Sequence, residues 1–336
     1  MRAVLERALA GERFSRDEMR AIVHTIVSGE VADAVIAAFL AALRTRGETL
    51  DEVIGAALAM RELALPLPAA PANAVDTCGT GGDGAGTINL STIAGLVVAG
   101  AGVPVAKHGN RAASSRCGSA ELLEALGVGI DAPPERMARA VHEVGFGFLY
   151  ARACHPAMAR VAAVRAALGV RTLFNGLGPL TNPVRPRRQL VGVAHAAQLE
   201  PMAQALAELG AEHAWVVHSE DGLDELSLGA RVHVVARRGA QVERFALEPG
   251  ELFPRADVAA LAGGDAAENA RIARRVLANE PGPKRDAVLL NAGAALCAAE
   301  RARELRDGVK LAAESLESGR ARVVLERLVE FSRGDT

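Results

Sequence analysis

The chain has 336 residues; half are hydrophobic and only 3% are aromatic, so its core must be built mainly from small aliphatic side chains. Its 38 basic and 40 acidic residues give a formal net charge of -2, which excludes a bulk electrostatic attraction to nucleic acid or to a membrane surface. A local basic pocket for a small anion stays possible. The length is enough for one large domain or two ordinary ones.

The N-terminus and the cysteine spacing both favour a cytoplasmic protein. Charges run through the first fifteen residues, without the apolar core of a signal peptide. The most apolar stretch, residues 93–106, is short for a membrane span and contains Pro104. No two cysteines have CxxC spacing, so we expect free thiols in a reducing compartment rather than zinc ligands or a disulfide framework. The four are Cys78, Cys117, Cys154 and Cys297.

The first 65 residues carry helical patterns. Residues 1–10 are amphipathic, Ser15 is a candidate N-cap, and Thr49 with Glu52 three residues later predicts another capped helix. Residues 31–44 are apolar on nearly every side, which is typical of a helix buried on more than one face. The simplest second partner for such a helix is another subunit. A proline-rich stretch around residues 65–71 then predicts a linker.

From about residue 72, short Val-rich runs alternate with helical patterns. This alternation predicts an α/β domain with a mostly parallel central sheet. The strand-like runs are 103–106, 190–193, 214–217 and 232–235. The helical patterns fall near 112–127, 134–144, 156–168, 197–210, 266–279, 284–299 and 301–317. We therefore expect a small all-helical domain, residues 1–70, completed by helices near 156–185, and a larger α/β domain, residues 71–336.

The stretch Asp76–Thr92, with the sequence DTCGTGGDGAGTINLST, is the most informative in the chain. A strand ending at Ala74–Val75 and a packed helix over Ile93–Val98 would place a glycine loop between them. Glycine permits positive φ and close approach of a ligand to the backbone, and a following helix N-terminus favours anions. Asn89, Ser91 and Thr92 stand where N-caps stand. On glycine content alone, a phosphate-binding loop and a simple surface loop are equally good interpretations.

A second polar loop, Lys107–Gly127, follows a strand-like run. The carboxyl end of a strand in an α/β sheet is the usual place for a ligand. Lys107 and Arg111 supply positive charge there, three serines supply hydroxyls and two glycines allow close approach. The pattern favours a second anion-binding loop over a merely solvated connection, whereas His108 by itself is more typical of a structural histidine.

Three further features are weaker. Asp224 and Glu225 form an adjacent pair beyond a strand-like run, which suits Mg²⁺ but is also common on solvated turns. Residues 171–183, RTLFNGLGPLTNP, predict an ordered irregular loop, and Arg165 by itself is read as a surface arginine. Two anion-binding loops and a possible metal pair indicate a polyphosphorylated substrate. The chain has neither a Walker lysine-serine pattern nor a GxSxG elbow.

These motifs, in this order, resemble the anthranilate phosphoribosyltransferase family. The matching segments are GTGGD at 79–83, NLST at 89–92, KHGNR at 107–111, SS…GSAELLEALG to Gly127, HPAM at 155–158, RTLFNGLGPLTNP, GLDE at 222–225 and NAGAAL at 291–296. The N-terminal run SGEVADAVIAAFLAALRTRGET also resembles the helical domain of that family. The resemblance covers nearly the whole chain, and the ordered set is far more specific than any single motif.

The resemblance implies transfer of phosphoribose from 5-phosphoribosyl 1-pyrophosphate to the amine of anthranilate, giving N-(5-phosphoribosyl)anthranilate and pyrophosphate. This is the second step of tryptophan biosynthesis from chorismate. It also implies the nucleoside phosphorylase/phosphoribosyltransferase type of fold, Mg²⁺ as two ions, and a homodimer joined through the helical domains.

Site roles follow from the same resemblance. It implies that Lys107 and Asp83 act in catalysis and that Ser91, Asp224 and Glu225 hold metal. Anthranilate would contact Gly79, Asn110 and Arg165. The residues implied to contact 5-phosphoribosyl 1-pyrophosphate are Gly79, Gly82, Asp83, Thr87, Asn89, Leu90, Ser91, Thr92, Lys107, His108, Gly109, Asn110, Arg111, Ala112, Ala113, Ser114, Ser115 and Ser119.

Some positions depart from the family pattern without removing a charged ligand. They are Ala112–Ala113, Cys117, Ala153–Cys154 and Gly176. The changes at Cys154 and Gly176 bear on the aromatic-acid channel and so on acceptor selectivity. Two alternatives stay open: a nucleoside phosphorylase of the same fold, which KHGNR and GLDE disfavour, and a non-catalytic nucleic-acid-binding relative, which the net charge and the Asp224–Glu225 pair disfavour.

Overall fold

The computed structural model describes residues 1–112 and 115–334, and these form two compact units. The helical unit contains Met1–Pro66 and Ala151–Pro183, and the α/β unit contains Leu67–Tyr150 and Val184–Thr336. Ala113 and Ser114, two of the residues expected to bind substrate, lie outside the described residues.

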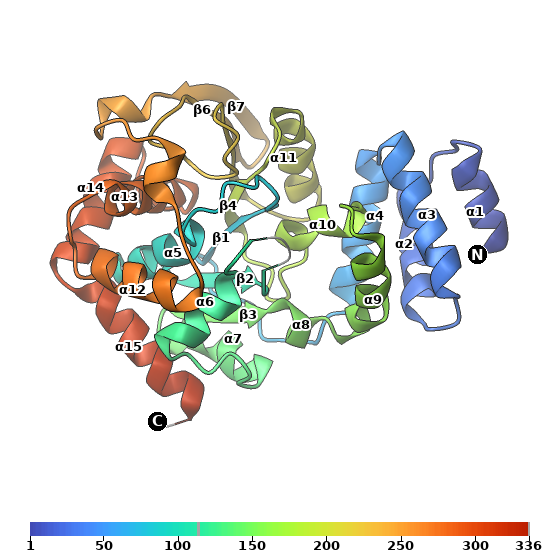
Figure 1. Cartoon of the computed structure of the whole chain (residues 1–336), viewed down its shortest axis with the longest axis horizontal. Helices are drawn as coiled ribbons and strands as arrows, with labels where there is room; N and C mark the ends of the chain where they lie inside the picture. Colours follow the sequence, from blue (N-terminus) through green and yellow to red (C-terminus); the bar gives the residue numbers. More distant parts are fainter. Residues whose placement is uncertain (113–114, 335–336) are drawn as a thin grey trace. The chain divides into compact units, whose positions relative to one another are not determined.

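The helical unit is built from short helices joined by tight connections. The N-terminal segment supplies α1 (Arg2–Leu9), α2 (Arg16–Val27), α3 (Asp33–Arg46) and α4 (Leu50–Glu62). The second segment supplies α8 (Ala151–Cys154), α9 (Ala159–Leu168) and α10 (Leu173–Gly176), with 3-10 turns at Pro156–Met158 and Gly178–Leu180. Figure 1 shows α3 beside α1, and α3 also contacts α9. The 156–168 pattern is therefore a 3-10 turn followed by a helix.

The predicted helix caps are confirmed. Ser15 caps α2 and Thr49 caps α4, each in a capping box with the glutamate three residues later. Glu52 does more than complete its box, because its side chain is fully buried. Its carboxylate accepts from the N–H of Phe14 at 2.9 Å, from the N–H of Thr49 at 2.8 Å and from Arg46 Nη1 at 3.0 Å. One carboxylate thus joins the start of α2, the end of α3 and the start of α4.

The α/β unit contains one seven-stranded sheet with the order β3-β2-β1-β4-β5-β6-β7. Strands β1 to β5 run parallel, and β6 and β7 continue as an antiparallel meander. The mostly parallel sheet is confirmed. The strands are β1 (Val75–Gly79), β2 (Val105–Gly109), β3 (Phe146–Tyr150), β4 (Arg188–Gly192), β5 (His213–Ser219), β6 (Val232–Arg238) and β7 (Gln241–Leu247).

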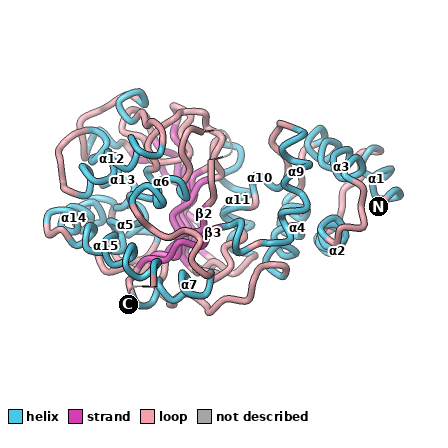
Figure 2. The backbone as a smooth tube through the Cα atoms, turned by 60° about the horizontal axis from the view of Figure 1, so that its bottom comes forward, coloured by secondary structure: helices cyan, strands magenta, loops and turns pink. Residues whose placement is uncertain are grey.

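Helices cover both faces of this sheet. Figure 2 shows α11 across the sheet from α5 and α13, which pack against each other and against the central strands. The helices are α5 (Leu90–Gly100), α6 (Ser119–Leu126), α7 (Pro134–Glu143), α11 (Leu199–Glu208), α12 (Ala266–Leu277), α13 (Pro283–Ala298), α14 (Leu305–Glu317) and α15 (Arg320–Arg333). No helix in the described ranges is both long enough and apolar enough to cross a membrane.

Several predicted boundaries were wrong. Strand β1 continues through Asp76 to Gly79, so the glycine loop begins at Thr80, because the buried polar residues of β1 find partners inside the sheet. Helix α5 begins at Leu90 rather than Ile93. Helix α6 begins at Ser119 rather than near 112. Gly118, its N-cap residue, lies against the backbone around Ala112, where a Cβ would collide. Strands β3 and β7 and helix α15 had not been predicted.

We expect Glu52→Gln to destabilise the helical unit by about 3 kcal/mol, because it removes a buried charge that Arg46 and two N–H groups require. Burial raises the pKa of Glu52, but the hydrogen bonds from Arg46, Thr49 and Phe14 outweigh it and hold the pKa below its ordinary value. The stabilisation is therefore present above the unfolded-state pKa, about 4.3, and is lost as the pH falls through the lower folded-state pKa.

The measurement is urea denaturation followed by circular dichroism at neutral and acid pH. Glu30→Gln is the matched control, because Glu30 is exposed and makes no ion pair among the described residues. Equal unfolding free energies for Glu52→Gln and the wild type at neutral pH would contradict the assignment.

Candidate active site

The carboxyl ends of β1 and β4 form the centre of the candidate site. From β1 the strand order proceeds to β2 and β3 on one side and to β4 and β5 on the other, so β1 and β4 meet at a topological switch point. In sheets of this kind, ligands bind beyond the carboxyl ends of the strands at such a point. The two strands end here in paired glycines, Gly79 and Gly192.

Both glycines are required by the close approach of Asp224. A Cβ on Gly79 would lie 2.5 Å from Asp224 Oδ2, and a Cβ on Gly192 would overlap the Asp224 main-chain carbonyl. The N–H of Gly81 donates to Asp224 Oδ2 at 2.6 Å. Asp224 is therefore buried directly against the ends of β1 and β4. Gly192 was not among the predicted site residues, because a single glycine at a strand end forms no motif.

The glycines of the loop after β1 are needed for the backbone conformation that they adopt. Gly81, Gly82, Gly84 and Gly86 all have positive φ, between 61° and 87°, which L side chains adopt rarely. Asp83 accepts from the N–H of Ala85 at 3.2 Å and so closes a local turn within the loop. The far end of the loop is tied down by a bridge between Thr87 and Ala262.

Lys107 lies in the interior of the site. Its ammonium group donates to the Thr77 carbonyl at 2.5 Å and to Ser91 Oγ at 3.2 Å. The N–H of Ser91 in turn donates to Glu225 Oε1 at 3.0 Å. Burial lowers the pKa of Lys107, while Asp76 and Glu225 oppose that shift. The structure thus brings together Lys107 from β2, Ser91 from α5 and Glu225 from the loop after β5.

Glu225 is held in an unfavourable environment for a carboxylate. Burial, followed by the neighbouring charge of Asp224, raises its pKa well above the ordinary value, although the Ser91 N–H opposes this. Beside the pair lies a small cavity of about 10 Å³, lined among others by Ser91, Asp224 and Glu225. A buried carboxylate, Asp224, next to a half-buried one, Glu225, is a donor pair that a hard cation would stabilise.

The side-chain oxygens of Ser91, Asp224 and Glu225 suit a cation that takes its other ligands from water and substrate. No group of three or more His, Cys, Asp or Glu side chains suited to a metal occurs within residues 1–112 and 115–334. Magnesium needs no such cage, because it keeps waters and takes oxygens from substrate phosphates in addition to one or two carboxylates. Ser91, Asp224 and Glu225 are therefore compatible with Mg²⁺.

The second loop is anchored at both ends by hydrogen bonds. Before it, the main-chain N–H of His108 on β2 donates to Asp76 Oδ1 on β1 at 3.3 Å, and after it Ser119 Oγ donates to the Asn110 carbonyl at 3.1 Å. A Cβ at Gly109 would collide with Ser119, so the glycine permits that contact. Arg111 is held by Glu124, with 3.0 Å between Nη1 and Oε2. The predicted start of this loop was wrong, because Lys107, His108 and Gly109 belong to β2, which runs from Val105 to Gly109; the loop itself begins at Asn110.

Asn89 does not have the role predicted for its side chain. It is the N-cap residue of α5, but its side chain makes no capping bond. Instead, its Nδ2 donates to the Cys117 carbonyl at 2.9 Å, and its Oδ1 accepts from Asn269 Nδ2 at 3.0 Å. Asn269 Oδ1 accepts from the N–H of Gly264 at 2.7 Å. This amide chain connects the start of α5, the second loop and the segment before α12.

A second asparagine supports the carboxylate pair. Asn291 on α13 accepts from the N–H of Leu226 at 3.0 Å and donates to the Leu226 carbonyl at 2.9 Å. Both main-chain groups directly after Glu225 are thereby fixed. The NAGAAL motif contains Asn291, but its contact with this loop was not predictable from the sequence.

Two predicted residues in α5 are buried. Leu90 is fully buried, and Thr92 is buried with no partner for its hydroxyl among the described residues. Of the remaining predicted positions, Ala112 donates its N–H to Glu121 Oε2 at 3.1 Å and Ser115 Oγ donates to the Cys117 carbonyl at 3.4 Å.

Arg165 belongs to the helical unit, on α9, whereas the other described site residues belong to the α/β unit. Its side chain is half-buried, and burial lowers the pKa of its guanidinium. The described residues offer it neither a hydrogen bond nor an ion pair. The interpretation as an ordinary surface arginine is therefore weakened, because a half-buried cation without a partner is poised for an anion.

The comparisons with known proteins agree with this arrangement. Residues 71–322 match the model of the glycosyl transferase family a/b domain, and residues 2–64 match that of its helical bundle domain. The anthranilate phosphoribosyltransferase of Symbiobacterium thermophilum is 50% identical over 99% of this chain and 98% of its own length. The crystal structure of the Thermus thermophilus enzyme is 51% identical with a TM-score of 0.93, covering 98% of this chain and 99% of that one. The Saccharomyces cerevisiae enzyme, in complex with PRPP and Mg, is 26% identical with a TM-score of 0.90, covering 99% of this chain and 97% of that one. The chain belongs to the anthranilate phosphoribosyltransferase family.

Proposed function

We propose that this chain transfers the phosphoribosyl group of 5-phosphoribosyl 1-pyrophosphate to the amine of anthranilate, releasing pyrophosphate, as the second step of tryptophan biosynthesis from chorismate. The observation that carries the proposal is the cluster of Lys107, Ser91, Asp224 and Glu225 beside a positive-φ glycine loop at the switch point of the sheet. Its chemistry fits a substrate with several phosphates and a bound cation.

The first task of the site is to stabilise charge. Breaking the bond between C1 and pyrophosphate leaves an oxocarbenium-like ribose and a highly charged leaving group. Lys107 supplies a fixed positive charge from β2, and the glycine loop from Thr80 to Thr87 supplies main-chain N–H groups. We assign Lys107 and Asp83 the catalytic roles.

The second task is to hold the substrate's phosphates and ribose. We assign the binding of 5-phosphoribosyl 1-pyrophosphate to the glycine loop, to the N-terminus of α5 and to the loop after β2. Because Nδ2 and Oδ1 of the Asn89 side chain are both already hydrogen-bonded, we assign the contact of Asn89 with this substrate to its main chain. The assigned residues are Gly79, Gly82, Asp83, Thr87, Asn89, Leu90, Ser91, Thr92, Lys107, His108, Gly109, Asn110, Arg111, Ala112, Ala113, Ser114, Ser115 and Ser119.

Magnesium, as two ions, would be held by Ser91, Asp224 and Glu225 together with substrate oxygens. When bound, it supplies positive charge against the pyrophosphate leaving group. The chain's own contribution is to keep Asp224 and Glu225 paired and in place through Gly79, Gly192 and Asn291.

We assign anthranilate to Gly79, Asn110 and Arg165. The half-buried guanidinium of Arg165, which has no partner among the described residues, suits the carboxylate of an aromatic acid. Cys154 is fully buried in the helical unit, and a Cβ at Gly176 would meet nothing within 4 Å. The space beside Gly176 is therefore open in the helical unit.

The reaction is tested by the loss of anthranilate fluorescence when purified protein, 5-phosphoribosyl 1-pyrophosphate and MgCl₂ are combined. We expect loss only with all three, and none in excess EDTA, because the carboxylate pair needs its cation. Absence of any loss with folded protein would refute the proposed acceptor or the proposed donor.

The carboxylate pair is tested by the double variant Asp224→Asn with Glu225→Gln, which keeps the shape of both side chains and removes their negative charges. We expect turnover to fall about a thousandfold with the fold intact. A near-normal rate in Mg²⁺ would remove the pair from the site.

We further propose that the asparagine chain positions the two substrate loops. In Asn269→Asp, one carboxylate oxygen would face Asn89 Oδ1, and turning the Asn89 amide would leave its oxygen facing the Cys117 carbonyl. We expect the KM for 5-phosphoribosyl 1-pyrophosphate to rise about tenfold, with the KM for anthranilate little changed.

Asn279→Asp is the control, since Asn279 lies just beyond the other end of α12 and contacts only Arg285 through its side chain among the described residues. If Asn269→Asp lowers the melting temperature and leaves both KM values unchanged, the asparagine chain is structural only.

We propose that two copies join through their helical units. The support is a single exposed leucine of the N-terminal helices, Leu9 on α1, which is 67% exposed. Burial of such a side chain in a subunit interface would remove apolar area from water.

The four cysteines are free thiols, which fits our assignment to the reducing cytoplasm.

Sedimentation velocity measures the assembly directly. We expect twice the chain mass of 34.8 kDa, and a shift toward the single-chain mass for Leu9→Glu. A single-chain mass for the wild type at micromolar concentration would contradict the dimer.

A further inference from the structure

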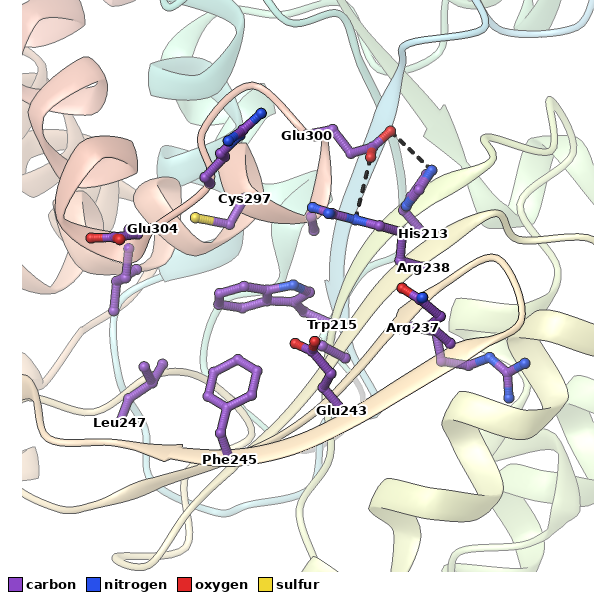
Figure 3. A pocket seen from close by; sticks show the side chains of 15 residues that line it. His213, Trp215, Arg237, Arg238, Glu243, Phe245, Leu247, Cys297, Glu300 and Glu304 are labelled. Carbon is purple, nitrogen blue, oxygen red and sulfur yellow. Dashed lines mark ion pairs between the residues drawn. The ribbon is translucent and has the colours of Figure 1, made fainter.

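A second, larger cavity lies on the α/β unit away from the site described above. It has a volume of about 510 Å³, within the range of small-molecule sites. Its walls come from β5, β6 and β7 on one side and from the end of α13 and the start of α14 on the other (Figure 3). It adjoins His213, at the beginning of β5, whereas Asp224 and Glu225 follow the opposite end of that strand. The proposed reaction does not use this cavity.

The sheet side of the cavity is aromatic and hollowed. Trp215, Ala236 and Glu243 are paired across β5, β6 and β7 and form one row on the same face. The small side chain of Ala236 leaves depth at the centre of that row. Trp215 is half-buried and meets Phe245 edge-on, with 5.4 Å between ring centroids and 78° between planes. An aromatic wall of this kind suits a flat ligand ring.

One end of the cavity is closed by a rigid ionic cluster. Glu300 pairs with Arg188 at 3.1 Å, with His213 at 2.9 Å and with Arg238 at 3.5 Å. Figure 3 shows Glu300, His213 and Arg238 turned toward one another above the aromatic floor. Because Glu300 serves three partners, this end fixes the shape of the cavity and leaves little free negative charge for a ligand.

The remaining charged groups are of both signs. Arg237 on β6, Glu243 on β7, and Arg303 and Glu304 before α14 line the cavity and make no ion pair within the described part of the chain. A ligand with only one sign of charge would leave the opposite groups unmatched. A ligand with an ammonium group and a carboxylate would find a partner for each.

We propose that this cavity binds a small aromatic zwitterion, with its ring against Trp215 and Phe245, its ammonium group toward Glu243 or Glu304, and its carboxylate toward Arg303. The site is separate from the phosphoribosyl site and does not depend on the proposed reaction. It is formed within the α/β unit alone.

Trp215 is the only tryptophan of the chain, so its fluorescence reports on this cavity directly. The probe is L-phenylalanine, titrated into the full-length protein with selective tryptophan excitation. We expect a saturable change with a dissociation constant of about 1 mM, as befits a ligand of a dozen heavy atoms. Benzoate carries only the negative group and 2-phenylethylamine only the positive one, and we expect each to bind about tenfold more weakly.

Two variants locate the binding. Ala236→Leu fills the hollow and should abolish the response, whereas Ala246→Leu, an exposed position on the opposite face of the same hairpin, should keep it. The double variant Glu243→Gln with Glu304→Gln should weaken the binding of L-phenylalanine and leave that of benzoate unchanged, which tests the site even if Ala236→Leu misfolds.

Three results would overturn the proposal. The first is no saturable response of the wild type to any of the three probes, and the second is an undiminished response in folded Ala236→Leu. The third is binding of benzoate or 2-phenylethylamine as tight as that of L-phenylalanine, which would exclude a zwitterion as the ligand class.

Discussion

The seating of Asp224 against two strand ends is the constraint on which the rest of the site depends. Gly79 and Gly192 end neighbouring parallel strands in register, and only the absence of two Cβ atoms lets the Asp224 segment lie there. A buried carboxylate in that position is costly unless N–H groups or a cation meet it. The Gly81 N–H supplies one partner, and the loop that carries Gly81 is thereby fixed at its first turn.

The charged side chains of this site are linked through Ser91. Lys107 donates to the Thr77 carbonyl and to Ser91 Oγ, and the N–H of Ser91 donates to Glu225, the residue after Asp224. Burial lowers the pKa of Lys107 and raises that of Glu225, so the site disfavours both charges until a ligand balances them. A polyphosphate with its cation brings opposite charges in one complex, which explains why the protein can keep so polar a cluster in its interior.

Much of the fold and of the candidate site could be predicted from the sequence. The site features that were not predicted share a physical reason. The helix caps at Ser15 and Thr49, the mostly parallel sheet and the two polar loops each have a local signal, and the structure has them. The two-residue turn of the β6–β7 hairpin is Gly239–Ala240, and Gly239 has a positive φ. A glycine in a two-residue connection is a hairpin signal that the sequence carries, although β7 was not predicted. The Asn89 side chain was predicted as a cap, but a tertiary partner 180 residues away along the chain determines its role. Gly192, Asn269 and Asn291 could not be found locally, because each acts through a contact that exists only after folding.

The two asparagine connections explain how distant segments can hold one site. Asn291 fixes the main chain behind Glu225 from α13, and Asn269 fixes the start of α5 and the second loop from the region of α12. An amide is suited to this task because it donates and accepts at once and carries no charge into a site whose charges are already finely opposed. An acid in either place would add a carboxylate to the buried Asp224–Glu225 environment or remove a donor from the chain of bonds. The C-terminal third of the chain therefore contributes to the phosphoribosyl site without supplying a ligand, and its helices can be read as the support that keeps the glycine loop and the acidic pair in register.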